Sequence, residues 1–597
     1  MVALLAMSAR AQDSAPSLRE SISGYESAAH QYFQGVPTDW TSRHVVFSKP
    51  QPGSEAEDKV QQDPRYWIQQ IRRAQLADED SVAAHKKKLA KTPKAKPLPK
   101  SHKDWAFSLG NGTVAENMLP AKFSFNTGAG TLTTANCTSD FAVYGLNVAG
   151  ATAGQANLVA LDNLYSGTSP AGLCGGAPTV LWAYNVTTHT GGTVTTSPQL
   201  SLDGKEILFV ESYSAGSVLH ILRWNSADGG TVAASKAPAQ TQTAFSSCTG
   251  STSCLVSIPL GGTSAHTITN SSVYYVYGTD TAYVGDDDGT LYAVTPVLGS
   301  GTPVVTTRAV GATTKLTGPV YDGSSGLVFV GGANGVLYAV VGSTMTLPAN
   351  STLQVGDASC TSGNNQLADA PLVDGADSFV FETAMTGTDG THTVVVQAAT
   401  TGTNSPTGTS WTAAATANIG TGDEGCGSGS TFPTHTPQFD NTYYSTPSSG
   451  HMWACGAENN GTTHHPELWN IAFTGTPALL GAVSGVTTSI NTTNHAQCSP
   501  LTEFFNANDL LYLGEGLSAS FGSLYGFTIS GTTATGITGS PITYPSATGG
   551  TSGIIIDNMA TQAQASSIYF TTLAKSTTVC GATSAFCAIK LTQSGLN

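Results

Sequence analysis

The chain has 597 residues, of which only 11% are charged, and its formal net charge is −15. This length exceeds one ordinary domain unless the domain is built from repeats, and low charge with 66 glycines is atypical of a disordered chain or a helical bundle. No apolar run reaches the roughly 18 residues of a transmembrane helix, so the composition favours a turn-rich, extracellular, all-β protein.

The charge is divided unevenly along the chain. Residues 1–103 hold 16 basic and 11 acidic residues, whereas residues 104–597 hold 8 basic and 28 acidic residues. A body this acidic repels phosphate backbones, so we expect no binding of nucleic acid.

The first residues resemble the end of an export signal. Val2–Met7 is apolar, and Ala9-Arg10-Ala11 has the small-x-small spacing of a signal-peptidase site. We therefore interpret residues 1–11 as a signal-peptide remnant, cleaved before Gln12. The alternative is a disordered apolar N-terminus.

Residues 12–103 are predicted to form a basic, partly helical head. Helix-like spacing covers residues 17–33 and 63–89, and a stretch rich in Lys and Pro follows at 86–100. This stretch suits a solvated linker; the alternatives are a tether to anionic envelope surface or glycan, or a nucleic-acid contact. Trp40 and Trp105 are expected to anchor this part to folded structure.

The body, residues 104–597, repeats itself. Residues 271–294 and 318–341 read SSVYYVYGTDTAYVGDDDGTLYAV and GPVYDGSSGLVFVGGANGVLYAVV, and residues 197–222 follow the same order of strand, turn, strand, turn and strand. Weaker copies bring the number of units to eight. The segments 229–265 and 399–430 are interpreted as insertions between units.

Units of about four short strands at this spacing are typical of a β-propeller. We therefore predict a single all-β propeller of seven or eight four-stranded blades, with eight favoured, behind a partly helical N-terminal extension. Tandem β-sandwiches and a β-helix fit the repeat length less well. Fourth strands are expected at 303–310, 351–356 and 477–483, and an N-terminal strand near Phe107 or Phe123 is expected to complete the last blade.

The ten cysteines are even in number and contain no CxxC pair. The spacing favours Cys137–Cys174, Cys248–Cys254 and Cys580–Cys587. Cys360, Cys426, Cys455 and Cys498 have three possible pairings, of which 360–426 with 455–498 is favoured. Paired cysteines imply an oxidising compartment, so we expect a secreted or cell-envelope protein.

The segments YVGDDDGTLYAV and VFVGGANGVLYAV resemble the repeat of pyrroloquinoline-quinone-like β-propellers. With Asp104–Gly110 and the stretch NLVALDNLYSG, the whole chain is similar to secreted proteins of soil bacteria. The resemblance implies the propeller fold. Quinone enzymes of that family use adjacent cysteines, which this chain lacks, so we expect no quinone cofactor.

Three groups of residues are candidates for chemistry. Asp286, Asp287 and Asp288 could hold calcium, but consecutive carboxylates suit a solvated turn better than a calcium loop. His435, His451, His464, His465 and His495 lie among carboxylates and could bind a transition metal, although their spacing matches no metal motif. Asp423 and Glu424 could serve as paired carboxylates of a glycosidase.

The sequence therefore predicts a secreted, non-catalytic, monomeric propeller that binds a protein, a glycan or envelope material through its loops. The alternatives are an extracellular enzyme acting on a polysaccharide and a metal-dependent oxidoreductase.

Overall fold

The computed structural model describes most of the chain. The described residues are 34–50, 52–70, 100–125, 135–167, 172–261, 267–311, 314–359, 367–421, 433–458, 465–485, 490, 497–504, 509–518, 521–536, 549–558, 565–581 and 583–594.

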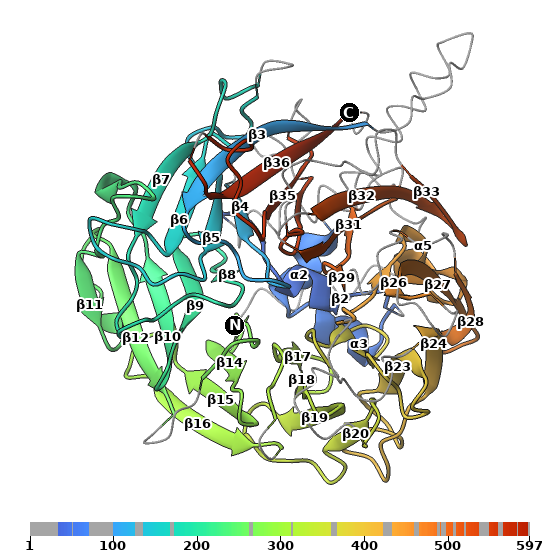
Figure 1. The fold of residues 1–597 in the computed structure, drawn as a ribbon. Helices are drawn as coiled ribbons and strands as arrows, with labels where there is room; N and C mark the ends of the chain where they lie inside the picture. Colours follow the sequence, from blue (N-terminus) through green and yellow to red (C-terminus); the bar gives the residue numbers. More distant parts are fainter. Residues whose placement is uncertain are drawn as a thin grey trace, which may run out of the picture.

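Eight mainly antiparallel sheets stand around a central axis, so the fold is an eight-bladed β-propeller (Figure 1). The prediction of an all-β propeller with eight blades is confirmed. Within each blade the innermost strand lies at the axis and the outermost strand lies at the rim.

The first four blades are built from the following strands. Blade 1 holds β4 (Ala121–Phe125), β5 (Phe141–Gly145), β6 (Leu158–Asp162) and β7 (Thr179–Tyr184). Blade 2 holds β8 (Gln199–Leu200), β9 (Glu206–Tyr213), β10 (Gly216–Arg223), β12 (Cys254–Leu260) and β11 (Gln240–Gln242). Blade 3 holds β13 (Tyr274–Val276), β14 (Thr281–Gly285), β15 (Thr290–Thr295) and β16 (Val304–Ala309). Blade 4 holds β17 (Val320–Asp322), β18 (Leu327–Gly331), β19 (Val336–Val341) and β20 (Thr352–Gln354).

The remaining blades follow the same order. Blade 5 holds β21 (Leu372–Asp374), β22 (Phe379–Ala384), β23 (His392–Ala399) and β24 (Ala415–Thr421). Blade 6 holds β25 (Gln438–Phe439), β26 (His451–Ala457), β27 (Pro466–Thr474) and β28 (Leu479–Gly485), with the short helix α5 (Asn441–Ser445). Blade 7 holds β29 (Gln497–Cys498), β30 (Thr502–Phe504), β31 (Leu510–Ser518), β32 (Phe521–Ser530) and β33 (Thr533–Gly536). Blade 8 holds β34 (Ile555–Asp557), β35 (Ser567–Thr571), β36 (Phe586–Ser594) and β3 (Lys100–Gly110).

The ring is closed by the N-terminal part of the chain. β3 pairs antiparallel with β36 along its length, so the outermost strand of the last blade comes from the start of the body. A closed ring leaves no sheet edge between the last and first blades. The predicted closure by a strand containing Phe107 is confirmed.

Apolar side chains fill the gaps between neighbouring blades. Between blades 2 and 3, for example, Leu208 and Ile221 pack in one buried cluster with Val284. Because a blade cannot cover both its faces alone, these layers stabilise the ring only as a set.

Two segments interpreted as insertions carry strands instead. Residues 254–260 form β12, which pairs with β10 along its length, and residues 415–421 form β24, the outer strand of blade 5. Long polar connections precede both strands, so the sequence pattern did not predict them. The predicted fourth strands are confirmed as β16, β20 and β28.

Four of the predicted cysteine pairs lie at bonding geometry. They are Cys137–Cys174, Cys248–Cys254, Cys455–Cys498 and Cys580–Cys587. Cys360 and Cys426 lie outside the described residues. Four such pairs indicate an oxidising environment.

The N-terminal segment enters the ring. Residues 1–33 and 71–99 lie outside the described residues, so the predicted signal remnant, the first predicted helix and most of the Lys/Pro linker do too. The boundary at residue 103 stays a prediction, but residues 35–49 of the predicted head lie within the propeller. None of the described helices is long and apolar enough to cross a membrane.

Candidate functional site

The central channel of the ring is filled by residues 35–49. β1 (Gly35–Thr38) pairs antiparallel with β4 at the inner edge of blade 1, and β2 (Val45–Val46) pairs in parallel with β21 at the inner edge of blade 5. The short helix α2 (Thr41–His44) joins them and lies at the centre of the ring (Figure 1). Blades 1 and 5 stand on opposite sides of the ring, so the segment crosses the whole channel. We call residues 35–49 the plug.

The first half of the plug is bonded to blades 2 and 3. The Asp39 carboxylate accepts the backbone N–H groups of Thr41 and Leu200, at 3.0 and 3.1 Å. The Trp40 indole N–H donates to the Val273 carbonyl at 3.0 Å. Both side chains are buried, so the plug is held by directed hydrogen bonds as well as by apolar packing.

The second half of the plug is bonded to blades 5, 6 and 7 through Arg43. Its guanidinium donates to the carbonyl oxygens of Leu501 at 2.8 Å and Thr436 at 3.3 Å. It also lies 3.4 Å from the carboxylate of Asp369. One side chain of the plug thus holds three blades.

Asp369 is the centre of a cluster of charged and titratable groups. The imidazoles of His44 and His435 each have a nitrogen 3.5 Å from its carboxylate. Burial acts to raise the pKa of Asp369, but the nearby His44 and His435 imidazoles and the Arg43 guanidinium outweigh burial and hold that pKa below its usual range. Burial lowers the pKa of His44 to about 4, so Arg43 is the permanent cation beside Asp369 at neutral pH.

A second carboxyl lies inside the ring near this cluster. Glu382 of β22 is buried, its Oε2 has no hydrogen-bond partner among the described residues, and its Oε1 accepts the N–H of Thr383. Burial, with a smaller contribution from the charge of Asp369, raises the pKa of Glu382 well above its usual range. Burial thus favours the protonated form of Glu382.

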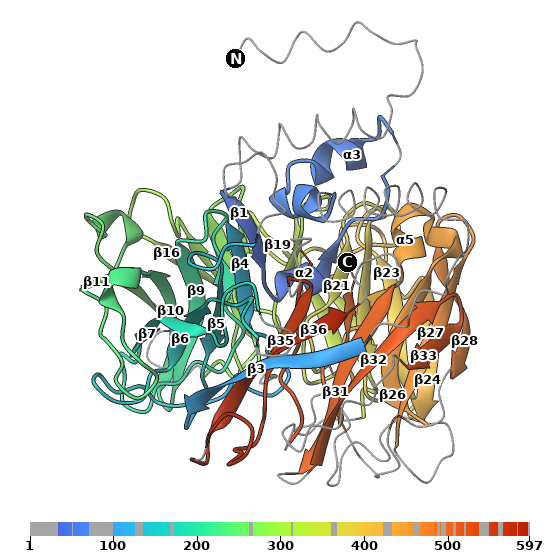
Figure 2. The ribbon, with the colours of Figure 1, turned by 90° about the horizontal axis from the view of Figure 1, so that it is seen from above.

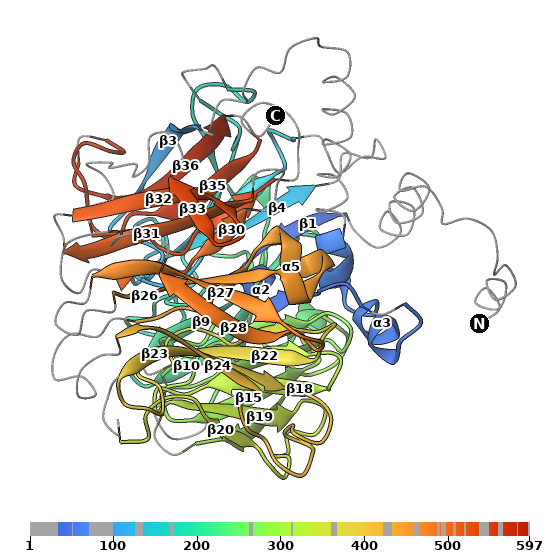
Figure 3. The same cartoon turned by 90° about the vertical axis from the view of Figure 1, so that its right-hand side faces the viewer.

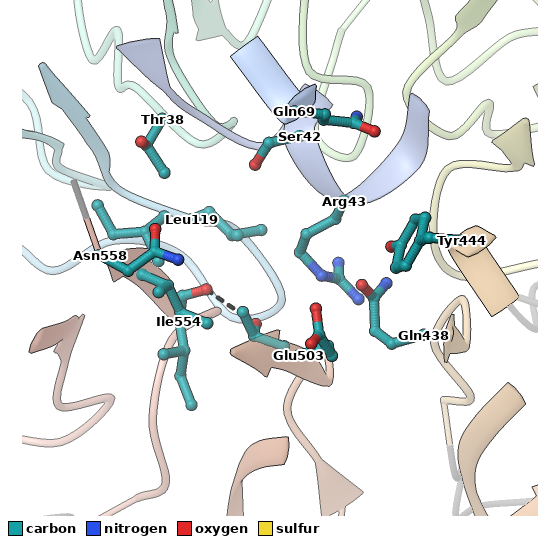
Figure 4. A pocket seen from close by; sticks show the side chains of 13 residues that line it. Thr38, Ser42, Arg43, Gln69, Leu119, Gln438, Tyr444, Glu503, Ile554 and Asn558 are labelled. Carbon is teal, nitrogen blue, oxygen red and sulfur yellow. Dashed lines mark hydrogen bonds between the residues drawn. The ribbon is translucent and has the colours of Figure 1, made fainter. Parts of the chain in front are cut away.

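A pocket opens beside the plug at the axis (Figure 4). It contains about 690 Å³ of unfilled space, part of it open to solvent. The plug forms one wall, blades 6, 7 and 8 form most of the others, and Gln69 and Leu119 complete the lining. The lining residues are Thr38, Ser42, Arg43, Gln69, Leu119, Gln438, Tyr444, Thr502, Glu503, Ile554, Ile555, Ile556 and Asn558.

The plug side of the ring is further covered by residues 52–70. Helix α3 (Glu55–Val60) stands on this face (Figure 2) and projects from it in the side view (Figure 3). Lys59 donates to the Ser324 carbonyl of blade 4, and Arg65 donates to the Tyr275 carbonyl of blade 3. The Arg65 guanidinium also lies over the ring of Tyr274, so this cover is attached at several points.

The three predicted calcium ligands make separate local bonds. Asp286 is buried and accepts the N–H groups of Asp288 and Thr290. Asp287 accepts the Thr267 hydroxyl, and Asp288 is exposed. Asp286 thus shapes the β14–β15 turn, and calcium binding here stays a prediction.

The predicted histidine cluster is spread over different carboxylates. His435 lies beside Asp369, His451 lies 3.0 Å from Asp440, and His465 lies 2.7 Å from Glu458. His464, His495, Asp423 and Glu424 lie outside the described residues. Within the described part of the chain, no three His, Cys, Asp or Glu side chains gather as metal ligands would.

One aligned set of polar residues was missed in the sequence. The Ser257 hydroxyl lies 3.1 Å from His220 Nδ1, and His220 Nε2 lies 2.8 Å from the Glu211 carboxylate. They lie on adjacent strands β12, β10 and β9, where His220 is directly opposite Ser257. Ser257 sits within a strand whose backbone is engaged with β10, unlike a nucleophile on a sharp turn beside free N–H donors. We assign this set to the structure of blade 2.

No family model matches the chain, and no curated protein matches it. Among solved structures, the C-terminal WD40 domain of Sif2 has a TM-score of 0.41 and 9% identity, covering 83% of this chain and 99% of that one. A chain of the mitotic checkpoint complex has a TM-score of 0.32 and 10% identity, covering 71% and 91%. BamB from Moraxella catarrhalis has a TM-score of 0.31 and 13% identity, covering 69% and 95%. The pyrroloquinoline-quinone-like resemblance stays a prediction, and the fold assignment rests on the eight sheets themselves.

Proposed function

We propose that the chain is an exported, non-catalytic propeller that binds a partner protein through the loops of one face. The observation that carries this proposal is the plug. Inner strands of a propeller converge at the axis, which is where polar groups from several blades can act together on a small ligand. In this chain residues 35–49 cross that position and leave only the pocket beside them, and their Asp39, Trp40 and Arg43 bond to the blades.

The face opposite the plug cover is the proposed contact surface. Successive strands alternate in direction, so the β14–β15 turn, Asp286–Gly289, lies on the face away from the β17–β18 turn that Lys59 contacts. Loops on a rigid scaffold can differ in sequence without disturbing the blades, which suits them to recognition.

Charge favours a basic protein as partner over an anionic polymer. Residues 104–597 carry 28 acidic and 8 basic residues. Within the part of the body that the structure describes, eleven carboxylates and two lysines are buried, which leaves most of the acidic excess outside the described core. Anionic polysaccharide or lipid would be repelled, whereas a basic protein surface would be attracted.

A photo-crosslinking amino acid tests this proposal. It is placed at exposed Asp288 on the proposed face, and at exposed Glu55 on the plug cover as the matched control, in cells that express and export the chain. We expect a discrete protein adduct from position 288 that is lost in high salt and not seen from position 55. Adducts from position 55 alone, or none from 288, would overturn the proposed face.

A second assay addresses the absence of catalysis. The purified chain is incubated with xylan, chitin and pectin, and new reducing ends and unsaturated products are measured. We expect neither to form. Product that increases in proportion to the amount of protein would replace the proposal with a polysaccharide-degrading enzyme.

A further inference from the structure

Two lysines are buried where the last blade meets the first. Lys122 of β4 lies with its Nζ 2.6 Å from the Asp557 carboxylate of β34, and neither side chain has any exposed surface. Lys590 of β36 lies 2.6 Å from the Asp104 carboxylate of β3, and this pair is equally buried. Each pair joins the beginning of the body to its end.

The Lys122 amine is held in one orientation. Its Nζ donates to the hydroxyl of Ser124 and, at 2.9 Å, to the hydroxyl of Tyr165. The Tyr165 hydroxyl is fixed in turn, because it donates to the Asp140 carboxylate at 2.6 Å. Two of the three N–H bonds of the ammonium group are thus used by hydroxyls, and the third points at Asp557.

A dry site weakens the preference for charged groups. Amide formation requires the amine and the carboxylic acid, which differ from the ammonium–carboxylate pair only by transfer of the proton shared across the 2.6 Å contact. Once the proton has moved from Lys122 to Asp557, the nitrogen lone pair lies on the axis that faces the carboxyl group.

We propose that Lys122 and Asp557 join in an intramolecular isopeptide bond that closes the ring covalently. The bond from Lys122 Nζ to the Asp557 carboxyl carbon forms, and the bond from that carbon to its hydroxyl oxygen breaks. The nitrogen gives up one proton to the departing hydroxyl, and one water molecule leaves. No oxidant, reductant or other reactant is needed, and the fixed contact supplies the high effective concentration that amide formation requires.

Residues around the pair have distinct roles. Tyr165 contacts the reacting amine and orients it, and Asp140 is a positioning residue that acts through Tyr165. Lys590 and Asp104 are expected to remain an ion pair. Their carboxylate also accepts the Thr592 hydroxyl, and their strands β36 and β3 are held in register by the sheet.

Mass spectrometry of the wild-type full chain tests the proposal without any variant. The folded protein is denatured, reduced and digested with pepsin. We expect a joined peptide containing Lys122 and Asp557, lighter than the two separate peptides by one water. Complete recovery of the two separate peptides from the folded protein would overturn the proposal.

Variants then identify the groups involved. Lys122→Met should abolish the joined peptide and slow migration of the reduced chain in a denaturing gel, whereas Lys590→Met should leave the joined peptide in place. Tyr165→Phe and Asp140→Asn should slow bond formation by about 100-fold after refolding, as loss of orientation does, while near-ultraviolet circular dichroism stays native. Unchanged rates in variants that keep the native spectrum would contradict the assigned roles.

Discussion

Replacing Arg43 with Met tests whether the plug holds the ring together. The substitution keeps an unbranched side chain but leaves Asp369 buried without its permanent cation, and it deprives the carbonyls of Leu501 and Thr436 of their donor. Removing one partner of a buried ion pair costs about 3–5 kcal/mol, and a lost hydrogen bond costs about 1 kcal/mol. Because the losses share one side chain, we expect a total near 4–6 kcal/mol.

The expected shift in melting temperature follows from the size of the ring. An unfolding entropy of about 2.1 cal/mol/K per residue over roughly 500 residues gives about 1 kcal/mol per degree. Arg43→Met should therefore lower the Tm by about 4–6 °C in a calorimetric scan. Adding Asp369→Asn should restore part of this loss, because the double variant no longer buries an unpaired charge.

Lys59→Met is the matched control. Lys59 belongs to the same N-terminal segment, but its ion pair with Glu55 is exposed, and together with its hydrogen bond to the Ser324 carbonyl it should contribute about 1–2 kcal/mol. If Arg43→Met lowered the Tm no more than Lys59→Met, or if Asp369→Asn gave no recovery, the plug would not be a joint between blades.

Three further predictions concern stability. The folded pKa of His44, about 4, lies below the unfolded value of 6.5, so the contribution of neutral His44 to stability is complete above about pH 6.5 and is lost toward pH 4. His44→Gln should therefore flatten the fall of the Tm between pH 6.5 and pH 4. A Tm profile unchanged from that of the wild type would contradict the assignment. Trp105→Ala should lower the free energy of unfolding by about 3–5 kcal/mol, since Trp105 is buried in the closing strand and donates to the Leu164 carbonyl. If the loss of stability were no larger than that caused by Trp67→Ala, at a partly exposed position, closure by β3 would be contradicted. Removing the disulfide Cys455–Cys498, whose residues are 43 apart, should lower the free energy of unfolding by about 4 kcal/mol. Removing Cys248–Cys254, whose residues are 6 apart, should lower it by about 2 kcal/mol. Equal losses of stability in urea unfolding would contradict the loop-entropy argument.

The blades could be predicted from the sequence because their signals are local. The two LYAV segments form β15 and β19, and the glycines after the second strands lie in the turns that the pattern requires. The closing strand was predictable because a closed ring needs a partner strand for the open edge of its last blade, and Phe107 lies in the strand that pairs there.

The plug could not be predicted because its contacts are distant in sequence. Residues 35–49 read GVPTDWTSRHVVFSK. No pattern in this stretch predicts that Arg43 donates to the Leu501 carbonyl or that Val45 pairs with Val373. Burial of Trp40 was expected, but its partner at Val273 was not. Likewise Asp369 stands in an ordinary polar connection, and its neighbours His44 and His435 come from two other parts of the chain.

The plug also sets an order on the assembly of the molecule. Arg43 is synthesised early, yet its bond to Leu501 spans 458 residues, and β3 cannot pair with β36 until nearly the whole chain exists. Contacts this distant in sequence form slowly, because the chain must lose the entropy of a very long loop before they stabilise anything. The first half of the plug can bind early, because its partners lie in blades 1 to 3, whereas Arg43 reaches Leu501 only after blade 7 has been made. Closure of the ring is therefore a late event, and a chain cut short before β36 would leave β3 and β35 each without β36 as a partner strand.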